Sequence, residues 1–255
     1  MIKKLAIAAL FGAMFTSAFA SETNTKGNNM STLPTQAAVT AALKTVVADK
    51  NGGFGLQMWA TLVDRDGVVT SVSFSGKDRG DQWPGSRVIS AQKANTANAF
   101  SLPGLALSTA NLFTATQPGG SLFGLQHSNP VDTAVAYGGD SEKIGTANDP
   151  MVGKKIGGVN VFGGGLALYA KDGTIIGALG VSGDASCADH NIAWKLRAAL
   201  GLATIPGGIS PDADDNIVND ITDGASASGW GHPECTPESA AIAKAFSKTH
   251  PITKK

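Results

Sequence analysis

The 255-residue chain has few aromatic side chains, two cysteines and no excess of charge of either sign. Phe, Trp and Tyr make up 6% of the residues, so we expect a core built from Ala, Val, Leu and Ile. Lys and Arg number 20, as do Asp and Glu, and no basic stripe occurs. This balance argues against a nucleic acid or an acidic membrane surface as a partner. Glycine is abundant, at 32 residues, which predicts many tight turns.

The signatures of common hydrolases and nucleotide-binding proteins are missing as well. The sequence contains no G-x-S-x-G nucleophile elbow, no H-E-x-x-H motif and no Walker P-loop. Ser182 can be drawn as a nucleophile with His190 as its base, but nothing in the sequence brings the two together. We therefore assign no catalytic residue.

Residues 1–20 have the pattern of a secretory signal peptide. Lys3 and Lys4 precede an apolar run, 5–15, which is too short to span a bilayer. The small residues Ala18 and Ala20 then fit a cleavage site, and residues 21–34 predict a flexible leader. We expect cleavage after this site, a periplasmic or secreted location, and no membrane association afterwards.

The two cysteines, Cys187 and Cys235, allow three interpretations. In an oxidising compartment an even pair predicts a disulfide, here closing a loop of about 48 residues. The spacing C-x-x-H … H-x-x-C, which adds His190 and His232, also suits a tetrahedral zinc site. Free thiols are the third interpretation.

Alternating apolar patterns predict four strands in two hairpins. Residues 56–63 and 68–74 flank one Asp-Gly turn, and residues 158–169 and 174–181 flank another. The sequence thus predicts an α+β fold with a single antiparallel sheet built from two hairpins and flanked by helices. Helical periodicity and end signals predict the helices at 35–49, 86–100, 107–115, 188–200 and 237–246.

Composition divides the chain further. Residues 130–157 are rich in Asn, Pro, Gly and Asp and predict an insertion within a domain that spans 35–202. Residues 203–255 predict a C-terminal extension, which a disulfide between Cys187 and Cys235 would tether.

Three segments together resemble the GlcG/HbpS-like family of haem-binding and poorly characterised small proteins: 61–100, 117–130 and 163–193. The third is the most specific, through Gly163-Gly164-Gly165 and the later glycine-rich run 176–183. The resemblance covers about residues 35–200 and identifies the chain as an enlarged, exported member. It implies a sheet flanked by helices with profilin-like layering, assembly into a homo-oligomer, and haem as the ligand.

Haem binding needs an apolar slot and a donor for the iron. The sequence lacks C-x-x-C-H, so covalent c-type attachment is excluded. His127 is our candidate iron ligand, because apolar neighbours such as Phe123 can line a slot; an ordinary loop histidine is the alternative. The remaining cofactor-binding candidates are Lys93, Gly164, Gly183 and His190.

The leading functional hypothesis is an exported haem (tetrapyrrole) binding protein, non-enzymatic, acting as a carrier, buffer or sensor partner. A second hypothesis is an enzyme acting on a small carboxylate or oxidised metabolite, bound at the glycine-rich turn 180–184 ahead of a helix N-terminus. A third is a ligand-free structural oligomer. The alanine-rich helix 86–100 suits close packing between subunits, which predicts a homo-oligomer under all three.

Calcium is a further candidate, because an acidic segment resembles half of a calcium-binding loop. Ile217 occupies the position that needs glycine, and Asp223 replaces the usual bidentate Glu, so a solvated acidic loop is the favoured alternative. The oxygen donors of this segment are Asp212, Asp214, Asn216, Asp220 and Asp223.

Overall fold

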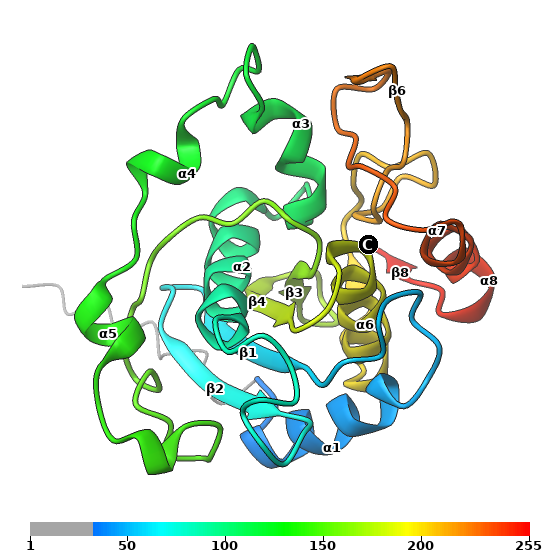
Figure 1. Ribbon diagram of the computed structural model, residues 1–255. Coiled ribbons are helices and arrows are strands. Elements are labelled where there is room, and N and C mark those ends of the chain that lie inside the picture. Colours follow the sequence, from blue (N-terminus) through cyan, green and yellow to red (C-terminus); the bar gives the residue numbers. More distant parts are fainter. Residues whose placement is uncertain (1–32) are drawn as a thin grey trace, which may run out of the picture.

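Figure 1 shows the computed structural model, in which residues 33–255 are described. The predicted signal peptide, and all but the last two residues of the predicted leader 21–34, lie outside the described residues. Within 33–255, no helix has both the length and the apolar character that a membrane span requires.

The centre of the fold is a four-stranded sheet with the order β2-β1-β4-β3, antiparallel throughout. The two predicted hairpins are confirmed: β1 (Trp59–Asp64) pairs with β2 (Val69–Phe74), and β3 (Gly165–Tyr169) pairs with β4 (Ile175–Ser182). Strands β1 and β4 join the hairpins into one sheet. The third strand is shorter than predicted and begins only at Gly165, directly after Gly164, whose φ of +117° favours glycine.

Helix α2 (Ser86–Phe100) covers one face of this sheet and coincides with its predicted bounds (Figure 1). Its small residues Ala91 and Ala94 are fully buried. The approach to β4 is so close that a Cβ at Gly180 would overlap the backbone of Ser90 and Ala94. The alanine-rich side of this helix, which we expected to serve contacts between subunits, therefore packs against the protein's own sheet.

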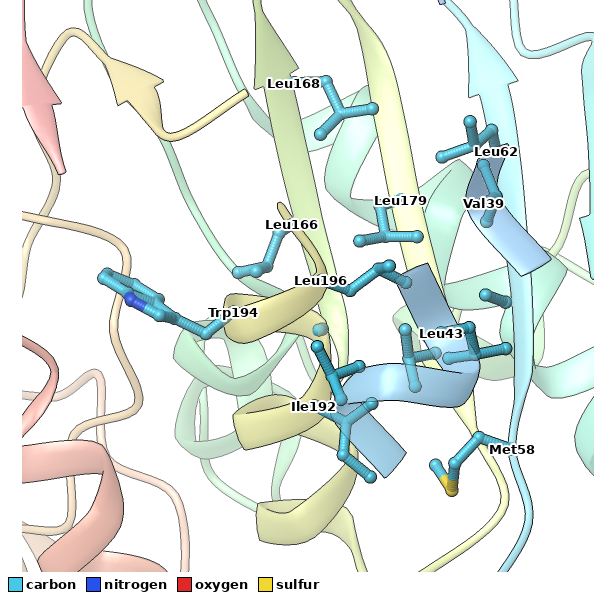
Figure 2. Packing of buried hydrophobic residues seen from close by; sticks show 14 of the residues in the cluster. Val39, Leu43, Met58, Leu62, Leu166, Leu168, Leu179, Ile192, Trp194 and Leu196 are labelled. Carbon is cyan, nitrogen blue, oxygen red and sulfur yellow. The ribbon is translucent and has the colours of Figure 1, made fainter. Parts of the chain in front are cut away.

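Helices α1 (Gln36–Val47) and α6 (Ser186–Ala199) cover the opposite face. Figure 2 shows leucines of β1, β3 and β4 pointing toward apolar side chains of these two helices. The aliphatic core that the composition predicts is thus found between sheet and helices. Its central members are Val39, Leu43, Leu62, Leu166, Leu179, Ile192 and Leu196.

The predicted helix at 107–115 is replaced by two short helical turns, η2 (Thr109–Leu112) and α3 (Phe113–Thr116), and α4 (Leu125–Ser128) follows them. This segment forms an arc that leads away from α2 into the predicted insertion (Figure 1).

The segment 130–157 contains α5 (Thr133–Tyr137) and η3 (Ser141–Lys143), and it buries more than its composition suggests. Met151 and Ile156 pack into a cluster with Trp59 of β1. Arg87 of α2 forms a buried ion pair with Asp149, with Nε 2.9 Å from Oδ2. The segment is therefore anchored to α2 and β1.

The C-terminal extension packs against α6. Cys187 and Cys235 are joined by a disulfide, as predicted, so the zinc and free-thiol interpretations do not describe this state. Arg197 of α6 forms a buried bidentate ion pair with Asp215, with N–O distances of 2.6 and 2.7 Å. The elements of the extension are β5 (Thr204–Ile205), β6 (Ile221–Thr222), β7 (Ala225–Ser226), α7 (Pro237–Lys244), α8 (Phe246–Thr249) and β8 (Thr253–Lys254).

Candidate functional site

A pocket of about 240 Å³ opens where β4 ends and α6 begins. Two aromatic side chains stand at its rim: Trp83 is 53% exposed and Phe162 is 45% exposed. Exposed aromatic faces of this size beside a cavity mark a place where a flat apolar ligand can bind. The residues lining the pocket are Trp83, Gly85, Ser86, Ile89, Lys93, Phe162, Ser182, Asp184, Ser186 and Asp189.

Its wall includes an ion pair between Lys93 of α2 and Asp189 of α6, with Nζ 2.6 Å from Oδ2. Both side chains are almost fully buried, at 2% and 3% exposure. Lys93 also donates to the carbonyl of Val181, 3.1 Å away. A Cβ at Gly164 would lie 3.2 Å from Nζ and would overlap the Val181 carbonyl oxygen, so a side chain there would crowd the pair.

Burial dominates the electrostatics of this pair. It raises the pKa of Asp189 to about 6, although the Lys93 ammonium opposes the change. Burial also lowers the pKa of Lys93, against the attraction of Asp189. Two charges that have lost their water in this way contribute little net stability while they remain paired, and they cost much when one is removed.

In the turn that leads into α6, the carboxylate of Asp184 accepts hydrogen bonds from three backbone N–H groups. Asp184 Oδ1 accepts the N–H groups of Phe54 at 2.8 Å and Ala185 at 2.6 Å, while Oδ2 accepts that of Leu56 at 3.0 Å. Within 180–184, the N–H of Val181 donates to the carbonyl of Gly164 at 2.8 Å and that of Asp184 donates to Asp189 Oδ1 at 2.9 Å, so these donors are used by the chain itself. With Asp189 also close by, the pocket carries two carboxylates and one ammonium, which disfavours an anionic group in contact with them.

At the edge of the pocket, Ser186 meets His232 of the C-terminal extension. Ser186 Oγ lies 2.8 Å from His232 Nε2, and it accepts the N–H of Gly163 at 2.7 Å. His232 is 3% exposed. Its ring lies 5.1 Å from that of Phe113, which in turn lies 6.3 Å from the rim residue Phe162.

Three of the predicted cofactor-binding residues meet at this pocket. Lys93 lines it, Gly164 lies against Lys93, and Gly183 falls between the lining residues Ser182 and Asp184. His190 lies on α6 but is fully buried, with Nε2 3.1 Å from the backbone nitrogen of Ile217. Burial lowers its pKa to about 3, so it is neutral.

His127 and Phe123, in contrast, do not line this pocket. Both are exposed at α4, Phe123 at 61%. Their apolar neighbours Leu122 and Leu125 pack toward a separate cluster that contains Leu112. The assignment of His127 as an iron ligand therefore stays a prediction, at a place outside the lining of the Lys93 pocket.

Several oxygen atoms of the acidic segment 212–223 accept hydrogen bonds from the chain itself. Asp214 accepts the N–H of Asn216 at 3.0 Å, and Asp220 accepts the hydroxyl of Ser226 at 2.7 Å. Asn216 donates to the carbonyl of Ala243. Of the predicted zinc ligands, Cys187, His232 and Cys235 lie close together, and the two sulfurs are bonded to each other.

Sequence reasoning missed the aromatic rim and the partners of the buried lysine. Trp83 stands in a polar loop and Phe162 precedes the glycine run, so neither has a pattern that marks a site. Asp189 and Ser186 likewise belong to no motif that marks a site. The one available signal in the sequence is Trp83 itself, a large apolar side chain in an otherwise polar loop.

Comparison with known proteins gives one strong match. The profile of the family described as "Haem degrading protein HbpS-like" matches residues 32–198, well over half of the chain. Among curated proteins, no sequence matches this chain.

Solved structures of similar proteins fit less closely. A PduOC:heme complex is 25% identical and has a TM-score of 0.44, covering 64% of this chain and 89% of its own. Klebsiella pneumoniae protein ORFY is 23% identical, with a TM-score of 0.44, and covers 66% of this chain and 90% of its own. A double mutant of Streptomyces reticuli HbpS is 19% identical, with a TM-score of 0.39, and covers 78% of this chain and 99% of its own.

The matched profile spans all four strands of the main sheet, helices α1 and α2 and all of α6 except its last residue, so it contains every lining residue of the Lys93 pocket. The predicted resemblance is confirmed over that region, and the chain belongs to the HbpS-like family of haem-degrading proteins.

Proposed function

We propose that the protein binds haem at the Lys93 pocket. The observation that carries the proposal is the pair of half-exposed aromatic rings, Trp83 and Phe162, beside a cavity within the family-matched region. Rings of this kind stack on flat apolar ligands. The haem named in the family's description has the shape and the apolar character that such a rim accommodates.

The size of the pocket sets how the ligand is held. A volume of about 240 Å³ is smaller than the roughly 300 to 1,000 Å³ of pockets that enclose a drug-sized ligand. The pocket would therefore not enclose the whole macrocycle, and Ile89 with the two exposed aromatic rings would supply the apolar surface that holds part of it. The carboxylates of Asp184 and Asp189 would disfavour contact with the haem propionates.

This mode of binding suits a carrier or buffer that passes haem on, or a partner of a sensor. It also leaves one face of the ligand open to a second copy of the chain, which supports a homo-oligomer. Light scattering with and without haemin tests this point: a rise in mass on loading supports it, and a monomer in both states contradicts it.

The signal-peptide pattern at 1–20 and the disulfide support a periplasmic or secreted location. Mass spectrometry of the protein from the cell exterior or periplasm should give a mature N-terminus near Ser21. An intact N-terminus on a cytoplasmic protein would contradict the location.

The test of the proposed function is a haemin titration followed by the Soret band. Wild type should saturate at one haem per chain. Trp83→Ala should bind more weakly, and the matched control Phe123→Ala, which removes an exposed ring that does not line the pocket, should not change the affinity. Equal weakening of haem binding by both variants would reject the proposed site. Absence of saturation in the wild-type protein would reject haem as the ligand.

The family's description favours haem degradation as a second candidate function. Degradation is distinguished from binding by monitoring the Soret band of the haem-loaded protein over time in the presence of oxygen and a reductant. A Soret band that persists indicates a carrier, whereas a steady loss that Trp83→Ala slows indicates degradation at this site.

A further inference from the structure

Three side chains that commonly bind metals meet where the C-terminal extension joins α6. One potential ligand atom from each of Cys187, His232 and Cys235 lies within 4.8 Å of the other two. This set differs from the zinc site that the sequence spacing predicts, because it does not include His190, whose Nε2 lies 3.1 Å from the backbone nitrogen of Ile217. The two sulfur atoms are joined as a disulfide, so neither can bind a metal as a thiolate in that state.

The imidazole of His232 has an oxygen partner at each ring nitrogen. Nδ1 lies 2.7 Å from the carbonyl oxygen of Pro233, and Nε2 lies 2.8 Å from Ser186 Oγ. Histidines that bind metals use one ring nitrogen as the ligand while the other donates a hydrogen bond to such an oxygen. Either nitrogen of His232 can therefore bind a metal while the other keeps a partner that orients the ring.

The sulfur atoms have surroundings that suit metal ligands. The backbone N–H of Cys187, in the first turn of α6, donates to Cys235 Sγ at 3.2 Å. N–H groups at a helix N-terminus favour negative charge, and a thiolate is the form of cysteine that binds metals. Cys235 is exposed, so a reductant and a metal ion can reach the cluster from solvent.

The disulfide is not the only connection that holds these ligands together. The segment 232–235 supplies two of them, and hydrogen bonds tie down the residue on each side of it. Gly231 accepts the hydroxyl of Thr114 of α3 at 2.6 Å, and Thr236 donates its hydroxyl to the carbonyl of Gly52 at 3.0 Å. Both partners belong to the family-matched region 32–198, so opening the disulfide leaves the segment anchored beside the start of α6.

We propose that the reduced protein binds one Zn²⁺ ion through the thiolates of Cys187 and Cys235 and the imidazole of His232. Two thiolates and one imidazole form a ligand set that zinc uses in proteins, with a water molecule in the fourth position. The ion then holds the extension on α6 in the state that lacks the disulfide. None of the three ligands lines the Lys93 pocket, and the proposal does not depend on haem binding.

The change of state needs a reductant, which is a dithiol. The dithiol attacks the disulfide, is oxidised to its own disulfide, and delivers two electrons and two protons that convert the cysteines to thiols. The two thiols release two protons when they bind Zn²⁺ as thiolates.

The test uses the full mature protein, reduced with dithiothreitol and separated from it without oxygen. Titration with Co²⁺, a coloured substitute for Zn²⁺, should saturate at one ion per chain and give a thiolate-to-cobalt charge-transfer band. Added Zn²⁺ should displace Co²⁺ and remove the band. The oxidised protein should give no such band, because its sulfur atoms are bonded to each other.

Three variants identify the ligands. Loss of an outer-shell partner weakens metal binding by about 10- to 100-fold, so His232→Ala should raise the Kd for Co²⁺ at least that much while keeping a charge-transfer band. Cys235→Ser should lose much of the band. His127→Ala, at an exposed histidine outside the cluster, is the matched control and should bind Co²⁺ as the wild type does.

Circular dichroism and limited proteolysis before and after reduction test whether the extension stays in place. A native spectrum with residues 203–255 still resistant to protease supports the proposal, and release of the extension on reduction contradicts it. Absence of a saturable charge-transfer band in the reduced wild type, or an unchanged Kd in His232→Ala, overturns the proposal. Neither result affects the haemin titration, which uses the oxidised protein.

Discussion

Removal of the Lys93 ammonium tests how the buried pair at the pocket contributes to stability. In Lys93→Met, the long apolar side chain preserves most of the volume but leaves Asp189 without its cation. The side chain of Asp189 is 3% exposed, so water cannot replace the lost partner. Breaking a buried ion pair in this way costs about 3–5 kcal/mol.

A second substitution shows whether the charge is the cause. Asp189→Asn removes the negative charge and keeps an oxygen that can accept the N–H of Asp184, now 2.9 Å from Oδ1. The double variant Lys93→Met/Asp189→Asn should therefore recover most of the loss. Lys248→Met, at an exposed position on α8, is the matched control and should change the free energy of unfolding by less than about 0.5 kcal/mol.

The pH dependence of the stability lost in Lys93→Met follows from the pKa of the Asp189 carboxyl group. The folded-state pKa of Asp189, about 6, lies above its ordinary value of 3.8, and loss of the ammonium raises it further. The folded protein then binds the proton more tightly than the unfolded chain, so the destabilisation is absent below about pH 4 and grows as pH rises through the folded-state pKa. Lys93→Met should thus lose less stability at pH 5 than at pH 8.

Urea denaturation at the two pH values, with the disulfide intact, measures these differences. A loss below about 1 kcal/mol, the range of exposed ion pairs, would refute the claim that the pair is desolvated. Equal losses at both pH values, or no recovery in the double variant, would refute the assignment of the effect to the unpaired Asp189 carboxylate.

Three further predictions concern the framework around the pocket. Replacing both cysteines, in Cys187→Ala/Cys235→Ala, should lower the free energy of unfolding by about 4 kcal/mol in the chain-entropy model for a 48-residue loop, measured by urea denaturation; a change below about 1 kcal/mol would show that the extension needs no tether. Gly180→Ala should cost about 1–3 kcal/mol or more, because its Cβ would overlap the backbone of α2, whereas Gly104→Ala, which has open space, should be near neutral in the same thermal melt. Arg87→Met should cost about 3–5 kcal/mol and expose residues 130–157 to limited proteolysis, since Asp149 would be buried unpaired; cleavage elsewhere first would contradict the anchoring role.

The sheet and its main helices could be predicted because their signals are local. Alternating apolar residues on either side of an Asp-Gly turn specify each hairpin within about twenty residues, and helix 86–100 is marked by its own periodicity. The order in which the hairpins join, β2-β1-β4-β3, was not predicted, because the pairing of β1 with β4 links residues more than a hundred positions apart.

The insertion shows where local reasoning fails. Residues 130–157 have little periodicity, yet Met151 and Ile156 are buried against Trp59 of β1. Burial here depends on an ion pair between residues 62 positions apart, Arg87 and Asp149, which no local pattern reveals.

The site was only half predictable for the same reason. Lys93, Gly164 and Gly183 were found because the family resemblance falls on them, and they do meet at one pocket. Trp83, Phe162 and His232 come from three loops far apart in the sequence, and tertiary packing alone unites them. Two apolar neighbours of His127, Leu122 and Leu125, pack against a core cluster that contains Leu112.

The most direct test of the central claim is a crystal structure of the protein grown with haemin. The account predicts that the macrocycle lies against Trp83 and Phe162, at the Lys93 pocket. Haem bound at α4 beside Phe123 and His127, with the Lys93 pocket empty, would contradict it.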